Sequence, residues 1–271
     1  MAGVPFAKLE AWAVPAQLTP QWDHTYVISS CGLTWGCWGK SAGGTAIASG
    51  SGSSIIADCL SQPNATAGIS YGRTGVCHQT ANRILHPAGP ITVSGCRGYP
   101  VSAFAYGVYG RGAWATLSQC YPPGTVFAGK GHVIQTPRGD GMTAKDIYDQ
   151  AVSKAHSNPQ NEDAVRLAEL AALVEMNLGR PLDRVTFRQL AEIEADLQMQ
   201  QQRLADQLER GALEPDAYLA RINKALAVSM ERSVALLGNE QFNAIFGEAG
   251  RHPEGLIDPG GFRGATGIPT H

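Results

Sequence analysis

The sequence feature that most constrains the fold is an abrupt change of composition near Met142. Up to that residue the chain is rich in glycine and carries only 8 Lys/Arg and 4 Asp/Glu; after it there are 13 and 19, and apolar residues recur at helical spacing. Two stretches with such different patterns are expected to fold as different units. We therefore predict an α+β unit over residues 1–142, a helical unit over 143–250 and a flexible tail over 251–271.

The helical unit has a clear periodicity, and glycines follow the ends of its apolar runs. This pattern predicts helices over 143–156, 161–178, 186–210, 215–237 and 239–246. The third and fourth helices carry matching leucine-rich stripes, which is typical of an antiparallel helical hairpin. We expect this hairpin to serve as a docking or oligomerisation arm, so that the chain forms a homo-oligomer through its helical part.

The front unit begins with patterns typical of strands. Residues 8–14 are predicted as a strand, and 23–30 and 33–39 as a hairpin around a two-residue turn at Cys31-Gly32. That register places Tyr26 opposite Cys37 and His24 opposite Gly39.

Later segments of the front unit are less regular. The Gly/Ser-rich residues 41–54 predict a flexible loop, either a lid or a plain surface loop. Residues 91–93, 101–109 and 125–135 are predicted as further strands.

Composition excludes several classes of function. Neither half has the density of basic residues that binding a nucleic-acid backbone requires. No run approaches the roughly 18 apolar residues of a membrane-spanning helix. No phosphate-cradling glycine motif is present, so no cofactor is predicted.

All six cysteines lie in the front unit: Cys31, Cys37, Cys59, Cys77, Cys96 and Cys120. We expect no secretory leader and hence a cytoplasmic location, whose reducing conditions argue against disulfides. No C-x-x-C pair is present, so a structural zinc knuckle is not favoured either.

Cys77 is the candidate nucleophile. A helix is predicted over 75–85, with Thr74 as its N-cap and Cys77 in its first turn. The positive end of a helix dipole lowers the pKa of a thiol, and the free N–H groups there are placed to stabilise an oxyanion. His78 is adjacent, but neighbours on a helix diverge by about 100°. The base must therefore come from another element.

Two strand histidines are candidates for that base, and their spacing from Cys77 does not choose between them. His24 opens a strand 53 residues before Cys77, and His132 opens one 55 residues after it. In either case the pair would form the nucleophile–base arrangement of a thiol enzyme.

The segment Tyr71-Gly-Arg-Thr-Gly-Val-Cys77-His-Gln-Thr-Ala-Asn-Arg resembles the nucleophile helix of papain-like thiol hydrolases. It follows a histidine strand, Asp23-His24-Thr-Tyr-Val, and this order resembles the circularly permuted papain-like group, which includes lecithin–retinol acyltransferase-like proteins. The resemblance covers about residues 23–87. It implies a papain-like small sheet, with Cys77 attacking an acyl, amide or ester carbonyl and His24 as its base.

This sequence departs from the family at the third polar residue, which usually orients the histidine from the next strand, because the predicted register leaves Gly39 there. The segment Gly131-His132-Val-Ile resembles the histidine strand of the unpermuted peptidases. We favour His24, because its strand continues into a hairpin.

Three functional hypotheses follow. The first is a thiol-dependent hydrolase or acyltransferase acting on a protein or acyl substrate, with peptide or isopeptide amides placed before lipid acyl groups. The second is a non-enzymatic interaction module with a helical oligomerisation arm, in which Cys77 is only a small core residue. The third is a metal-binding domain that uses His24, Cys37, Cys77 or His78.

Overall fold

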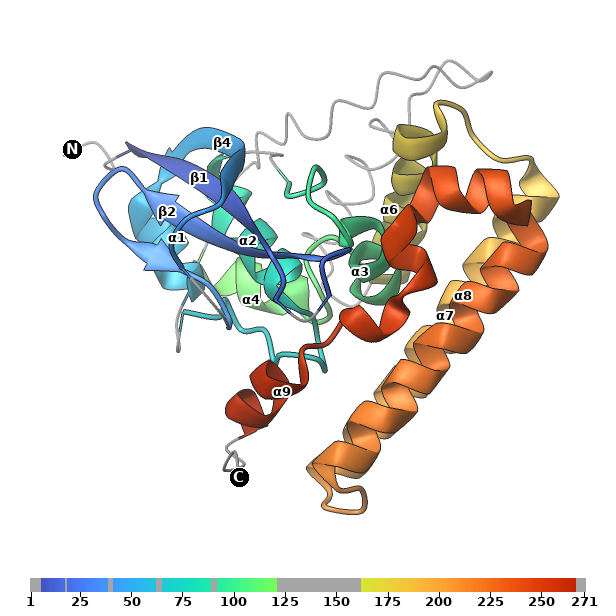
Figure 1. Cartoon of the computed structure of the whole chain (residues 1–271). Coiled ribbons are helices and arrows are strands. Elements are labelled where there is room, and N and C mark those ends of the chain that lie inside the picture. Colours follow the sequence, from blue (N-terminus) through green and yellow to red (C-terminus); the bar gives the residue numbers. More distant parts are fainter. Residues whose placement is uncertain are drawn as a thin grey trace.

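The computed structural model describes residues 6–17, 19–38, 41–61, 65–88, 92–120 and 162–266 (Figure 1). They form one four-stranded antiparallel sheet and eight α-helices, which confirms the predicted α+β class. The strands follow the order β3-β2-β1-β4. Their bounds are β1 Phe6–Pro15, β2 Asp23–Ser29, β3 Thr34–Trp35 and β4 Thr45–Ser53.

Helices make up most of the remaining described structure. The α-helices are α1 Ser54–Ser61, α2 Cys77–Leu85, α3 Tyr99–Tyr106, α4 Ala113–Cys120, α6 Glu162–Leu178, α7 Arg184–Glu209, α8 Pro215–Phe246 and α9 Pro259–Thr266. Three short 3-10 helices complete them: η1 His86–Ala88, η2 Glu248–Arg251 and η3 Pro253–Gly255.

The sheet buries one face against α2. Leu9 and Ala11 of β1 alternate inward with period two, as the predicted first strand requires, and pack with Val27 of β2. Ile84 and Leu85 of α2 complete this cluster from the helix side. Helix α2 is therefore fixed directly on the sheet.

The hairpin between β2 and β3 corrects the predicted register by one residue. Val27 pairs with Trp35, so the predicted pairing of Tyr26 with Cys37 is wrong. The reason lies in the turn: Ser29 N donates to Leu33 O at 2.8 Å, which closes a three-residue loop instead of a two-residue one. Gly32 takes a left-handed conformation in this loop, with φ of 89°.

Two predictions for the front unit are wrong, because segments rich in glycine or alanine take regular structures that their composition did not indicate. The supposed flexible loop at 41–54 contains β4, which pairs with β1 along nearly its whole length. A Cβ on Gly52 would lie 2.6 Å from Ala88 N, so glycine is there to admit η1 against the strand. The predicted strand at 101–109 is instead α3 and its exit turn, and α4 was not predicted at all.

The helical part follows its periodicity. The structure confirms the helices predicted over 161–178 and 186–210 as α6 and α7, with Asp183 capping α7. The helices predicted over 215–237 and 239–246 are joined in α8, across a non-helical Gly238. The helix predicted over 143–156 and the strand predicted over 125–135 lie outside the described residues.

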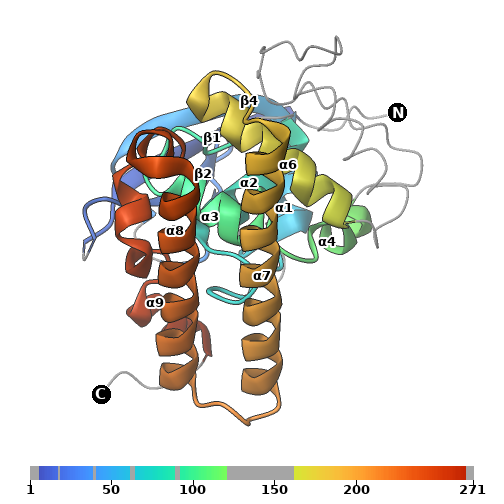
Figure 2. The same ribbon diagram turned by 90° about the vertical axis from the view of Figure 1, so that its right-hand side faces the viewer.

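The predicted hairpin of α7 and α8 is present, with its two helices side by side (Figure 2), and it packs against α3 and α6. The apolar stripes of the hairpin also pack against the front part of the chain. One core cluster contains Leu190 and Ile222 of the hairpin, Phe104 of α3 and Trp22 before β2. The rings of Phe104 and Phe246 meet edge to face with centroids 5.3 Å apart. The front and helical parts thus share one hydrophobic core.

The tail is the largest departure. Residues 251–266 were predicted as flexible, but they form η3 and α9 and bury Leu256, Ile257 and Phe262. These three side chains belong to the core cluster that joins the front and helical parts. Large apolar side chains anchor this Gly/Pro-rich segment in spite of its composition.

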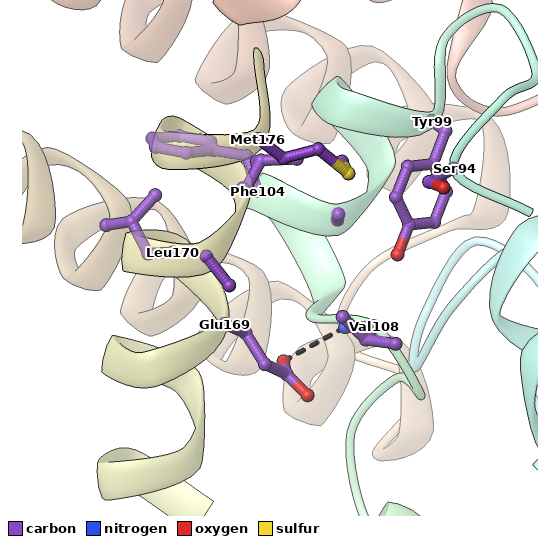
Figure 3. Close-up of a pocket in the computed structure, with 10 residues that line it drawn as sticks. Ser94, Tyr99, Phe104, Val108, Glu169, Leu170 and Met176 are labelled. Carbon is purple, nitrogen blue, oxygen red and sulfur yellow. Dashed lines mark hydrogen bonds between the residues drawn. The ribbon is translucent and has the colours of Figure 1, made fainter. Parts of the chain in front are cut away.

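A polar contact fixes α6 to the end of α3. Glu169 of α6 accepts a hydrogen bond from Val108 N at 3.0 Å (Figure 3). Beside it lies a void of about 20 Å³, lined mainly by apolar side chains such as Phe104, Leu170 and Met176. Space of this size holds about one water molecule.

Cys59 at the end of α1 and Cys120 at the end of α4 form a disulfide, with Cα atoms 5.9 Å apart. This contradicts the expectation that the cysteines stay reduced. Disulfides persist in oxidising compartments, so the pair also weighs against the predicted cytoplasmic location.

We expect the Cys59→Ala/Cys120→Ala variant to lose about 2–4 kcal/mol in its free energy of unfolding, because the bridge closes a 61-residue separation. Urea titration of oxidised wild type, reduced wild type and the variant measures this loss. Reduction should reproduce the effect of the double substitution and should add nothing to the variant. An oxidised protein no more stable than the variant would show that the bridge does not stabilise the fold.

A second long-range constraint is Arg83 of α2, which is fully buried. Its guanidinium donates to three backbone carbonyls in two loops: Ala67 O at 2.8 Å before α2, and Tyr109 O at 2.5 Å and Arg111 O at 2.8 Å between α3 and α4. Removing the donor leaves these buried acceptors unsatisfied.

We expect Arg83→Leu to lower the free energy of unfolding by about 3 kcal/mol or more. Arg188→Leu is the matched control, because that arginine's side chain is 73% exposed on α7. Its effect should stay within about 0.5 kcal/mol. Chemical denaturation of both variants decides the matter, and equal effects would contradict the structural role of Arg83.

Candidate active site

A cavity of about 530 Å³ lies where the start of β2, the first turn of α2 and the C-terminal segment meet. Cys77 and His24, the two predicted catalytic residues, both line it. The sequence separates them by 53 residues, and the fold brings them to one cavity. Its other walls include Trp22, Trp38 and Tyr71.

Cys77 is the first residue of α2 and only 8% of its surface is exposed. The predicted position in the first turn is thus confirmed, although the N-cap is Val76 and not Thr74. The Gln79 side chain accepts a hydrogen bond from Val76 N at 3.1 Å and so closes the first turn. Thr74 instead accepts a hydrogen bond from Ser70 N, within the preceding loop.

Burial dominates the acidity of Cys77. Desolvation raises the pKa of its thiol above the ordinary value, while hydrogen bonds from the backbone N–H groups of Thr25, His78 and Cys77 act in the opposite direction. The predicted lowering by the helix N-terminus is therefore outweighed, because the thiolate loses its hydration. The thiol of Cys77 is therefore neutral at pH 7.

His24 is the second residue of β2 and faces Val14 across the β1–β2 ladder. Its ring is stacked on that of Tyr26, with centroids 6.3 Å apart, and the residue lines the cavity beside Cys77. The alternative base, His132, lies outside the described residues.

His78 follows Cys77 but has a different environment. Its Nε2 lies 2.8 Å from the carbonyl oxygen of Asp23, and its Nδ1 lies 2.7 Å from Ser102 Oγ. Desolvation lowers the pKa of His78 to about 4, so the ring is neutral at pH 7. Because both nitrogens are engaged, His78 does not serve as the base.

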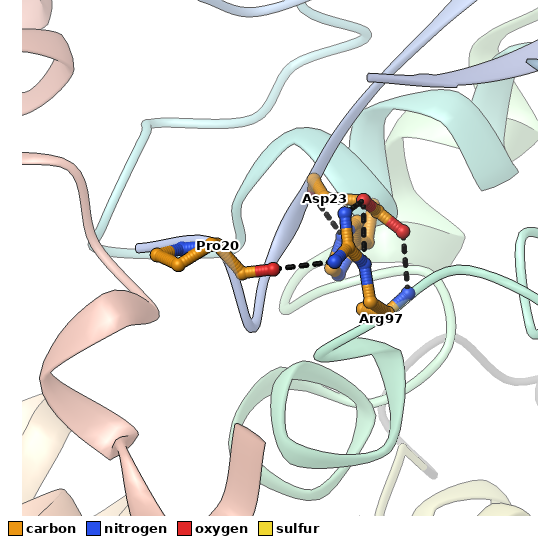
Figure 4. Close-up of polar contacts among 4 residues, drawn as sticks. Pro20, Asp23 and Arg97 are labelled. Carbon is orange, nitrogen blue, oxygen red and sulfur yellow. Dashed lines mark hydrogen bonds and ion pairs between the residues drawn. The ribbon is translucent and has the colours of Figure 1, made fainter. Parts of the chain in front are cut away.

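The start of β2 is fixed by an ion pair (Figure 4). The Asp23 carboxylate accepts hydrogen bonds from Arg97 Nη2 at 2.7 Å, from Arg97 Nε at 3.0 Å and from Arg97 N at 2.8 Å. Arg97 Nη1 also donates to Pro20 O at 2.5 Å. The residue immediately before His24 is therefore held at three points.

The outer wall of the cavity comes from residues 254–259, which sequence reasoning assigned to a loose tail. Asp258 N donates to Tyr71 Oη at 3.1 Å, and Trp22 Nε1 donates to His252 O at 3.0 Å. The only sequence signal for this wall was a set of large apolar residues within a Gly/Pro-rich stretch. Such residues are unexpected in a solvated tail.

The described residues offer neither a cluster of metal ligands nor a helix that could span a membrane. Among the described residues, no group of three or more His, Cys, Asp or Glu side chains is placed to hold a metal ion. Cys37 does lie near Cys77, and burial together with this neighbour raises the pKa of its thiol. None of the helices in the described ranges combines the length and the apolar character needed to cross a bilayer.

Comparisons of the chain with protein-family models, with curated proteins and with solved structures give no match. The similarity to the circularly permuted papain-like group stays a prediction that rests on residues 23–87.

Proposed function

We propose that this chain is a thiol-dependent hydrolase or acyltransferase in which Cys77 is the nucleophile and His24 is the base. The observation that carries the proposal is that both residues line one cavity of about 530 Å³, large enough for a small substrate. A sheet that contributes the histidine before a helix that contributes the cysteine supports the permuted papain-like arrangement.

The chemistry follows from the neutral thiol. His24 takes the proton of Cys77 while the sulfur forms a bond to the substrate carbonyl carbon, because a buried thiolate is not present beforehand. The backbone N–H groups of Cys77 and His78 lie at the helix N-terminus and stabilise the oxyanion. When the tetrahedral intermediate collapses, the leaving amine or alcohol takes the proton from His24 and a thioester remains.

The thioester is then released by attack of a second nucleophile. Water gives hydrolysis, and an amine or alcohol gives acyl transfer. In both cases His24 takes the proton of the attacking group and returns it to the Cys77 sulfur as the C–S bond breaks, which restores the neutral thiol and imidazole. Peptide or isopeptide amides are the first substrate class to test and acyl lipids the second. A cytoplasmic site of action remains part of this proposal, although the Cys59–Cys120 bridge favours an oxidising compartment.

The activated ester p-nitrophenyl acetate tests this proposal without knowledge of the natural substrate. We expect acetylation of wild-type protein at Cys77, measured by nitrophenolate release and by mass spectrometry of the modified peptide. Cys77→Ala should abolish the fast phase, and His24→Gln should slow it by about 10²–10⁴-fold.

Cys96→Ala is the control, because it removes a second buried thiol that does not line the cavity. This variant should be acetylated at the wild-type rate. If the exposed Cys31 is acetylated as fast as Cys77, the thiol of Cys77 is not activated and the proposal is wrong. If His24→Gln has no effect while Cys77 remains reactive, the base is another residue.

A further inference from the structure

We propose that His78 is a positioning residue: its ring joins the strand that carries His24 to the helix that carries Cys77. The inference rests on the proposed function. Its starting point is that His78 directly follows Cys77 and that its hydrogen-bond partner Asp23 directly precedes His24. One contact thus links the two residues that adjoin the nucleophile and the base.

The direction of that hydrogen bond defines the tautomer. A backbone carbonyl can only accept, so the 2.8 Å contact with Asp23 O requires the proton on His78 Nε2. In the neutral ring Nδ1 is then an acceptor. The Ser102 hydroxyl lies 2.7 Å from Nδ1 and 2.9 Å from Tyr99 O, so these two acceptors share its one hydrogen. Ser102 lies on α3 and is fully buried, so the ring contacts α3 on one side and β2 on the other.

The ring itself cannot turn without disturbing its neighbours. It is stacked on Trp22, with centroids 6.5 Å apart and planes 8° from parallel, and lies 6.1 Å from the ring of Tyr99. Gly98 makes room for Trp22, because a Cβ there would lie 2.2 Å from the indole. His78 is 1% exposed in this packing.

Asp23, whose carbonyl oxygen accepts the hydrogen bond from His78, is also held in place. The ion pair with Arg97 fixes the Asp23 side chain, and Asp23 N donates to Arg97 O at 3.1 Å. A displacement of Asp23 relative to His78 would therefore move His24 relative to Cys77. Misplacement of a catalytic group by about 1 Å lowers a rate by about 10²-fold.

Two substitutions separate the contacts of the ring. In His78→Gln the amide nitrogen takes the place of Nε2 and retains the bond to Asp23 O. In His78→Asn the amide reaches only the place of Nδ1, so the link to β2 is lost. Acetylation of Cys77 by p-nitrophenyl acetate should stay within about threefold of wild type in the Gln variant and fall by about 10–100-fold in the Asn variant.

His86→Gln and His86→Asn are the matched controls. His86 directly follows α2, is 9% exposed and packs against the rings of Tyr109 and Trp114, and it does not line the Cys77 cavity. The two control variants should show equal acetylation rates even where their melting temperatures fall as far as those of the His78 variants. This comparison separates positioning from a general loss of stability.

The outcomes distinguish the inference from the proposed function. If wild-type Cys77 is acetylated rapidly but His78→Gln and His78→Asn have equal rates, His78 is an ordinary buried core residue and the positioning role is wrong. If wild-type Cys77 is not acetylated faster than the exposed Cys31, the proposed function fails and the positioning role falls with it. A lower rate in Asn than in Gln, at matched melting temperature, supports both.

Discussion

The structure depends on the burial of a polar helix. All nine residues of α2 are buried, including Gln79, Asn82 and Arg83, whose side chains reach the backbone of the surrounding turns. Burying such groups is unfavourable unless each finds a partner, so the turns must converge on the helix at defined positions. The chain after α3 therefore takes its path from the hydrogen-bond donors of α2. This constraint also places Cys77, because the same helix begins at the cavity.

The same burial sets the electrostatic character of the candidate site. Loss of hydration raises the pKa of Cys77 and lowers that of His78, so both groups are neutral at pH 7. A preformed ion pair of thiolate and imidazolium is thus not what the fold favours. The proposed transfer of the Cys77 proton to His24 in step with the attack suits this environment, and residues 254–259 form one wall of the cavity.

Local patterns in the sequence predicted the parts of the fold that local physics determines. The periodicity of 161–210 predicted two helices with nearly correct bounds. The helix predicted over 75–85 has Cys77 in its first turn, and α2 begins at Cys77. Long-range contacts were beyond such reasoning. Nothing local indicates that Gly52 lies in a strand packed on η1, or that Ile257 closes a cavity formed by residues of β2. The partnership of His78 with Asp23 was missed for the same reason.

The neutral state of His78 sets an acid limit on the whole molecule. Its pKa is about 4 in the folded protein and near 6.5 in an unfolded chain, so between these values the unfolded chain binds the extra proton. The stabilising contribution is complete above about pH 6.5 and is lost as the pH falls toward 4. Acidification therefore lowers the free energy of unfolding through the ring that joins α2 to β2. In the folded protein that ring stays neutral down to about pH 4, so the link between the helix and the strand persists until the chain unfolds.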